Sequence, residues 1–268
     1  MTYLGDRFDA WRRARILSRY PIDSDLLATV LSELPVMRGL DAAEQMRLHA
    51  LTALFVHGKQ YFGTYGLEID DRLRLVVAAQ ACLLIVNMDT GHEPDVYPGW
   101  TSVILYPGTF VARHDYRDEV GIVHERIMTL DGEASRRGPL VLSWEAAAPS
   151  TKSPAHGRNV VLHEFAHKLD FLDGTSNGHP PLHRGMSTAG WARVFASAYA
   201  RLCKQVERGH RTPINPYAAT NPAEFFAVTT EVFFEQPHHL QQIWPEVYDQ
   251  LTQYYRQDPA ARQDRADS

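Results

Sequence analysis

Cysteine is scarce in this chain of 268 residues, and long apolar runs are missing. Two cysteines, Cys82 and Cys203, are too few for a disulfide framework, so we expect free thiols and a reducing, cytoplasmic location. The longest apolar run, residues 75–86, is interrupted by Gln80 and is shorter than the ~20 residues that span a bilayer. We therefore expect a buried helix there and no membrane segment.

Positive charge is also in short supply, since the net charge is -5. Proteins that bind nucleic acid usually neutralise phosphates with clustered lysine and arginine. The one basic cluster, at Arg12, Arg13 and Arg15, lies between aromatic residues and is typical of the solvated face of a helix. The first residues also carry acids and arginines where a secretory signal needs an apolar stretch. We predict no direct binding of nucleic acid and no signal peptide.

The pattern of residues changes twice along the chain. Residues 1–90 have mostly helical patterns. For example, Asp41 precedes apolar residues at helical spacing that continue to about His57. Residues 96–146 contain short runs of β-formers separated by Pro-Gly, Asp-Gly and Arg-Gly-Pro, which predict a small sheet. Helical patterns return over 153–255. This order predicts a mainly helical α+β fold in a single domain, residues 1–255, with a disordered tail at 256–268.

The clearest chemical signal is NVVLHEFAHKLD at residues 159–170. His163 and His167 are four residues apart, so on a helix their side chains lie together and can bind one metal ion at about 2.0 to 2.1 Å. Glu164 projects beside them, which suits a carboxylate that takes a proton from metal-bound water. Spacing and residue types match the H-E-x-x-H pattern of zinc peptidases.

The surroundings of this motif favour a functional site over a chance match. Pro154 suits the start of a helix, and apolar residues flank the two histidines at positions 160–162, 165, 169 and 172. Two histidines and a glutamate are costly to bury in such a setting without a role. We predict one bound zinc ion per chain. A structural zinc site is the weaker alternative, because such sites usually have four ligands and favour cysteine.

A catalytic zinc ion has a third protein ligand, and two arrangements compete for it. In the first, the chain turns at a glycine three residues after the second histidine, and Asp173 binds the metal. The position expected for this glycine is occupied by Asp170, and the next glycine, Gly174, comes too late for the turn. In the second, a downstream helix supplies a glutamate. Residues 215–235 offer Glu224 and Glu231, two turns apart on a similar face.

Glu224 also has a simpler interpretation. Asn221 as N-cap, Pro222 at the first helical position and Glu224 two positions later form a start similar to a capping box, which needs the glutamate only for local hydrogen bonds. Several phenylalanines and valines follow, so the helix is expected to be buried. Because a buried carboxylate needs a charged partner, this setting favours metal binding.

Three longer stretches resemble a known family. HEFAHKLD at 163–170, YAATNPAEFFAV at 217–228 and GPLVLSWEAA at 138–147 are similar to the Mlc titration factor A family of bacterial zinc peptidases, whose active site resembles that of anthrax lethal factor. The resemblance covers most of the chain and implies a zincin-like fold with a small mixed sheet beside the motif helix. It implies His163, His167 and Glu224 as zinc ligands and Glu164 as general base.

The resemblance also implies that Tyr217 helps to stabilise the transition state, since a phenol can donate a hydrogen bond to the oxyanion. The alternative is a tyrosine that only packs in the core or at a helix start. Asp170 and Glu231 are candidates to orient a ligand histidine, although an exposed acid at a helix end is equally consistent with Asp170. Residues 139–145 alternate in polarity, which suits either a sheet edge that pairs with a peptide or a core strand.

Two functions follow from these observations. The first is hydrolysis of peptide bonds by zinc-activated water, with aminopeptidase-like action on short peptides implied by the resemblance. The second is regulatory binding: the family name records capture of the repressor Mlc, so a Mlc-like transcriptional repressor is an expected partner in the control of sugar uptake. A chelator distinguishes the two functions, because it should abolish peptide cleavage, whereas repressor binding should survive if it is separate from the metal site.

Overall fold

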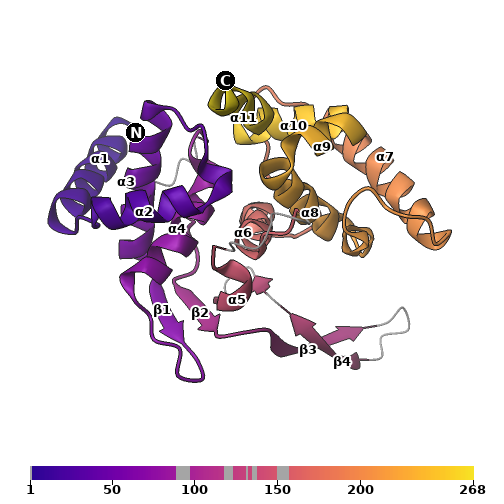
Figure 1. Ribbon diagram of the computed structural model, residues 1–268, viewed down its shortest axis with the longest axis horizontal. Coiled ribbons are helices and arrows are strands. Elements are labelled where there is room, and N and C mark those ends of the chain that lie inside the picture. The colour runs from indigo at the N-terminus through magenta and orange to yellow at the C-terminus, as the bar shows by residue number, and fades with distance from the viewer. Residues whose placement is uncertain (1, 89–96, 118–122, 131, 135–137, 150–156) are drawn as a thin grey trace.

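In the computed structural model, helices on two sides flank a small sheet and a central helix, α6 (Figure 1). The structure describes residues 2–88, 97–117, 123–130, 132–134, 138–149 and 157–268. Buried apolar residues from the early, middle and late parts of the chain form one cluster.

The first part of the chain contains helices and one strand. Its elements are α1 (Thr2–Arg19), α2 (Ser24–Glu33), the 3₁₀ helix η1 (Pro35–Met37), α3 (Ala42–Gly58), β1 (Gln60–Gly63) and α4 (Asp71–Ile85). Asp41 caps α3 in a full capping box with Glu44, as its sequence pattern predicts. Helix α4 is buried along almost its whole length, as expected for the apolar run. None of the helices in the described part of the chain is both long and apolar enough to cross a membrane.

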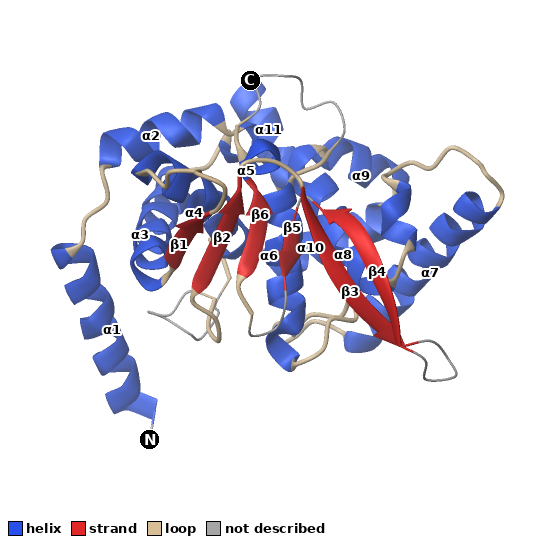
Figure 2. Cartoon of the chain, turned by 90° about the horizontal axis from the view of Figure 1, so that it is seen from below, coloured by secondary structure: helices blue, strands red, loops and turns tan. Residues whose placement is uncertain are grey.

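The sheet joins strands from distant parts of the sequence. The middle elements are β2 (Ser102–Tyr106), β3 (Phe110–Arg117), β4 (Val123–Leu130), β5 (Gly132–Ala134), β6 (Leu140–Ser143) and α5 (Trp144–Ala147). Strands β1, β2 and β6 are parallel, and β5 pairs antiparallel with β6, in the order β1-β2-β6-β5 (Figure 2). Strands β3 and β4 form a separate antiparallel pair. The predicted α+β fold with a small mixed sheet is confirmed.

The structure corrects one prediction about strands and decides between two alternatives for another. β1 lies in the part of the chain predicted to be mostly helical, because its four residues carry little pattern of their own and gain their partner from β2, some forty residues later. Of the two interpretations left open for residues 139–145, the core strand is confirmed and the sheet edge is not, because β6 lies between β2 and β5. Among the described strands of this sheet, β1 and β5 occupy the edges.

The third part of the chain is helical and carries the candidate site. Its elements are α6 (Val160–Asp170), the 3₁₀ helix η2 (Phe171–Asp173), α7 (Thr188–Glu207), the 3₁₀ helix η3 (Pro216–Ala219), α8 (Pro222–Glu235), α9 (Pro237–Ile243), α10 (Pro245–Tyr255) and α11 (Pro259–Asp267). Helix α6 packs on α4, on α8 and on β5. Phe165 of α6 contacts Phe55, Tyr97 and Trp100, which anchors α6 to the first part of the chain.

The prediction of a disordered tail at residues 256–268 is wrong. Asp258 caps α11, and Pro259, Ala260 and Arg262 on this helix are buried. The Arg262 guanidinium donates to the carbonyl of Val36 at 2.9 Å and to the Gln257 side chain at 3.0 Å. A tail poor in apolar residues is thus ordered by hydrogen bonds to a distant turn, which composition does not reveal.

Candidate metal centre

Helix α6 places the two histidines of the motif on one face. Asn159 caps the helix, since its side chain accepts a hydrogen bond from the Leu162 N–H at 3.0 Å. Pro154, predicted to start this helix, lies outside the described residues. The His163 and His167 rings are 4.9 Å apart between centroids, as the four-residue spacing predicts.

Glu224 lies against both histidines. Asn221 caps α8 and Pro222 is its first residue, as predicted, and the Asn221 side chain accepts from the Glu224 N–H at 2.9 Å. The Glu224 carboxylate turns away from the cap. Its Oε2 atom lies 3.0 Å from Nε2 of His163 and 3.4 Å from Nε2 of His167. Glu224 therefore contacts the histidine pair instead of completing a capping box.

These three side chains fit a zinc ion. Their donor atoms all lie within 4.8 Å of one another. Metal–ligand distances of about 2.1 Å at tetrahedral angles would place neighbouring donors about 3.4 Å apart, close to the spacings from Glu224 to the two rings. Two imidazoles and one carboxylate form a donor set that catalytic zinc uses with one position left to solvent. Asp173, the alternative third ligand, is exposed in η2, where its side chain accepts from the Thr175 N–H.

Glu231 supports His163 from the side opposite Glu224. Nδ1 of His163 lies 2.7 Å from Oε1 of Glu231, and the backbone N–H of Asn159 donates to Oε2 of the same carboxylate. The buried Glu231 side chain thus has a partner for each oxygen. Glu231, a candidate to orient a ligand histidine, thus contacts the ring of His163. Asn159 was not predicted as part of the site, although an asparagine directly before an apolar helix is a recognisable cap signal.

Glu164 is buried and lies against the edge strand β5. A Cβ atom placed on Gly132 of β5 would approach the Glu164 side chain to 2.6 Å, so only glycine leaves room for it. Burial raises the pKa of the Glu164 carboxyl, while the neighbouring histidines oppose the shift. A raised pKa brings a carboxyl closer to the range useful for proton transfer near neutral pH. From the sequence alone, Gly132 was interpreted only as part of the Asp-Gly turn signal.

Tyr217, on η3, lies beside the two histidines of α6. Asn215 caps this short helix by accepting from the Tyr217 N–H at 3.0 Å. The centroid of the Tyr217 ring is 6.2 Å from that of His163, and 38% of the tyrosine is exposed. A buried packing role is therefore excluded, and the ring is accessible beside the candidate ligands.

Asp170 has partners that differ from both predicted roles. It is fully buried, so it is not an exposed helix-end acid. Its Oδ2 atom accepts from the Ser176 hydroxyl at 3.0 Å and from the Gly178 N–H at 2.8 Å, and neither partner is a histidine. Asp170 thus organises the segment that follows α6.

The charges at the centre interact strongly. Burial raises the pKa of the Glu224 carboxyl, but hydrogen bonds from His163 and His167 outweigh it, so the net pKa lies far below the usual range. Burial lowers the pKa of His163, but Glu231 and Glu224 outweigh that effect and raise it well above its usual value. The two carboxylates thus favour the protonated form of the His163 imidazole. A divalent cation satisfies the same carboxylates.

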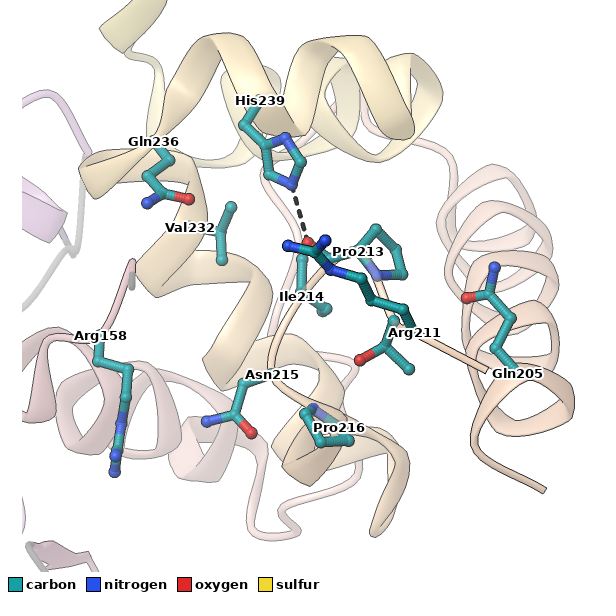
Figure 3. Close-up of a pocket in the computed structure, with 11 residues that line it drawn as sticks. Arg158, Gln205, Arg211, Pro213, Ile214, Asn215, Pro216, Val232, Gln236 and His239 are labelled. Carbon is teal, nitrogen blue, oxygen red and sulfur yellow. Dashed lines mark hydrogen bonds between the residues drawn. The ribbon is translucent and has the colours of Figure 1, made fainter. Parts of the chain in front are cut away.

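A cavity of about 780 Å³ opens beside the segment that carries Tyr217 (Figure 3). Residues 211–216 line it, together with Arg158, Gln205, Val232, Gln236 and His239. Nε2 of His239 lies 2.8 Å from the carbonyl oxygen of Pro213 across one wall. Asn215, the cap of η3, also lines this cavity, so the cavity wall and the position of Tyr217 depend on the same turn.

Known proteins match the chain over most of its length. It is 37% identical over 250 residues to the uncharacterized protein slr2042 of Synechocystis sp., across 93% of this chain and 89% of that protein. It is 32% identical over 231 residues to Mlc titration factor A of Salmonella arizonae, across 85% of this chain and 90% of that protein. The Salmonella typhi protein of the same name is also 32% identical, across 85% of each chain. Residues 8–256 match the glucose-regulated metallo-peptidase M90 family, to which this chain belongs.

Proposed function

We propose that this protein is a zinc-dependent peptidase whose metal ligands are His163, His167 and Glu224. The convergence of these three donors from two helices, within 4.8 Å of one another, carries the proposal. Membership of a metallopeptidase family supports it. The buried Glu164 beside the donors supports hydrolysis over a purely structural metal site, since a structural site has no need of a free carboxylate at its side.

Each remaining residue of the centre has a proposed task. A bound zinc ion would polarise the scissile carbonyl and acidify the attacking water. Glu164 accepts a proton from that water and passes it to the leaving amine. The Tyr217 phenol donates a hydrogen bond to the developing oxyanion, for which its exposed position beside His163 is suited. Glu231 holds the His163 ring so that Nε2 faces Glu224 and the metal position.

The substrate is proposed to be an extended peptide that pairs with β5. This strand is at an edge of the sheet among the described strands, and its Gly132 lies directly against Glu164. Addition of a strand at such an edge aligns a peptide backbone through main-chain hydrogen bonds. The peptide bond nearest Gly132 would then lie beside the proposed base. Aminopeptidase-like specificity for short peptides rests on the family resemblance.

The Glu164→Gln variant tests the proposed activity. The amide keeps the size of the side chain but cannot take the proton, so hydrolysis of a peptide library should fall by about 100- to 10,000-fold. Zinc content, measured by metal analysis of the purified protein, should stay at one ion per chain. A His163→Ala variant should lose the zinc ion as well. Parental rates of cleavage in the Glu164→Gln protein would overturn the proposal.

Regulatory binding is the second candidate function, and the Salmonella relatives named Mlc titration factor A favour it. We propose a Mlc-like transcriptional repressor as the partner, bound in the cytoplasm; the two free thiols, Cys82 and Cys203, support that location. Pull-down of a purified repressor of this type with and without a chelator tests it. Capture that survives chelation shows binding independent of the metal, and no capture under either condition contradicts the proposal.

A further inference from the structure

We propose that Asp170, Ser176 and Gly178 form a clamp that sets the position of Glu224 relative to the two histidines. The inference rests on the proposed metal centre and deepens it, because it names residues that position the third ligand without touching the metal. We call these three residues the Asp170 clamp. It connects the end of α6, which carries the histidines, to the beginning of α8, which carries Glu224.

One end of the clamp is a buried carboxylate on the metal-binding helix. Asp170 follows His167 by three residues, less than one turn of α6, and is completely buried. Its Oδ2 atom receives hydrogen bonds from the Ser176 hydroxyl and the Gly178 N–H. The carbonyl of Gly178 accepts a third bond, at 3.1 Å, from the indole N–H of the buried Trp191. The backbone of Gly178 is thus fixed through both of its polar groups.

The other end of the clamp is a contact between backbones. Gly178 has a φ of +76°, a conformation that favours glycine. A Cβ atom on Gly178 would lie 2.3 Å from the carbonyl oxygen and 2.7 Å from the carbonyl carbon of Pro222, closer than van der Waals contact allows. Pro222 is the first residue of α8, and Glu224 is two residues further on. Any movement of Gly178 towards α8 must therefore displace the turn that carries the third ligand.

A positioning role explains why a carboxylate is buried at residue 170. Burying a charged group costs free energy that an apolar side chain would not, so packing alone does not account for it. Directional bonds from Oδ2 to two residues eight positions or fewer away fix the geometry of the connecting segment instead. Near the start of α6, the two ligand-bearing helices are joined by hydrogen bonds from the His163 ring and the Asn159 N–H to Glu231. The clamp adds a restraint at the other end of α6, between Asp170 and the first turn of α8.

A pair of glycine substitutions tests this positioning. Gly178→Ala adds a methyl group where Pro222 leaves no room, whereas Gly185→Ala adds it at another left-handed position, φ +99°, with no atom within 4 Å. Both positions are left-handed, so Gly185→Ala controls for the cost of placing alanine in that backbone conformation. We expect Gly178→Ala to lower zinc affinity by about 10- to 100-fold, as substitutions around ligands do, and to change the absorption spectrum of the cobalt-loaded protein. Gly185→Ala should retain both properties.

Substitutions at Asp170 provide a second test. Asp170→Asn keeps one oxygen that can accept from Gly178, and Asp170→Ala keeps none, so zinc affinity should decrease in the order parent, Asn, Ala. Equal affinities and identical cobalt spectra in Gly178→Ala and Gly185→Ala, with no ordered loss across the Asp170 series, would overturn the clamp.

Failure of the clamp can be distinguished from failure of the proposed function. A parent protein that binds zinc but cleaves no peptide refutes the peptidase and leaves the affinity test of the clamp intact. If the parent binds no zinc, imidazole NMR signals of the metal-free protein replace the affinity measurement, since Glu224 contacts both histidine rings. The signals of His163 and His167 should then shift in Gly178→Ala and stay at their parental positions in Gly185→Ala; unshifted signals in both refute the clamp.

Discussion

Oε1 of Glu231 lies 2.7 Å from Nδ1 of His163, on the side of the ring opposite Glu224. Because the carboxylate accepts, Nδ1 carries the proton and Nε2 is left to bind a metal. The second oxygen of Glu231 accepts from the Asn159 N–H at the start of α6. One carboxylate thus sets both the tautomer of His163 and the first turn of the helix that carries it.

The Glu231→Gln variant should weaken zinc binding. A glutamine cannot accept from both His163 and Asn159, so one of the two bonds is lost. We expect zinc affinity to fall by about 10- to 100-fold, measured by competition with a chelator. Glu246→Gln, at an exposed acid on α10, is the matched control. Affinities that agree between the two variants would show that Glu231 does not orient the ligand.

Tyr217→Phe should reduce kcat while leaving the metal in place. Loss of one hydrogen-bond donor to an oxyanion costs about 100-fold or more in rate, and the exposed ring contributes little to stability. Steady-state peptide hydrolysis and zinc content are the two measurements. Tyr65→Phe serves as control because Tyr65 is 86% exposed and lies on the turn after β1, far from Tyr217 in the sequence. A Tyr217→Phe enzyme as fast as Tyr65→Phe would remove Tyr217 from the mechanism.

Glu235 should make stability depend on pH. Its carboxylate accepts from the Asn159 side chain at 2.8 Å. Burial raises its pKa from 4.5 to about 7, nearby Glu231 adds to the shift, and the Asn159 bond opposes it. The folded state therefore binds the proton more tightly than the unfolded state, and the free energy of unfolding decreases as pH rises from about 4.5 to about 7.

A Glu235→Gln variant should remove this dependence. The amide keeps the bond from Asn159 and carries no charge, so we expect the variant to be more stable than the parent by about 1 to 3 kcal/mol at pH 8 and nearly equal to it at pH 4. Urea unfolding at the two pH values measures the difference. Glu207→Gln, at the exposed end of α7, should show no such pH-dependent gain. A constant difference between Glu235→Gln and the parent would contradict the prediction.

Arg262→Ala should destabilise the fold. The substitution leaves the Val36 carbonyl and the Gln257 side chain without their donor inside the protein, at a cost of about 2 kcal/mol. Arg265→Ala, at an exposed arginine on the same helix, should stay within about 0.5 kcal/mol of the parent. Thermal and urea unfolding give both values. Equal stability of the two variants would mean that the docking of α11 contributes little.

Local signals made much of the candidate site predictable from sequence. The four-residue spacing of His163 and His167 fixes their common face, and Asn221 with Pro222 marks the start of the helix that brings Glu224 to them. The two-turn spacing from Glu224 to Glu231 places both carboxylates on His163. Such features depend on helix geometry within a few residues, so they can be predicted from the sequence without a structure.

Features that depend on distant partners were not predictable in the same way. The place of β6 between β2 and β5 follows from strand pairing, which a short alternating run does not encode. The partners of Asp170 depend on how the chain turns after α6, and the contact of Gly132 with Glu164 depends on where β5 packs. The order of residues 256–268 comes from a bond to Val36 and not from composition.

The bond between Arg262 and Val36 spans 226 positions of the sequence, which bears on how the protein is made. During synthesis, residues 35–37 leave the ribosome long before α11 is made. The Val36 carbonyl is therefore hydrated when this turn emerges. Contacts of such long separation form late, after the loop between them has closed. In a nascent chain the Val36 carbonyl thus has water, and not Arg262, as its partner until residues beyond 258 have left the exit tunnel.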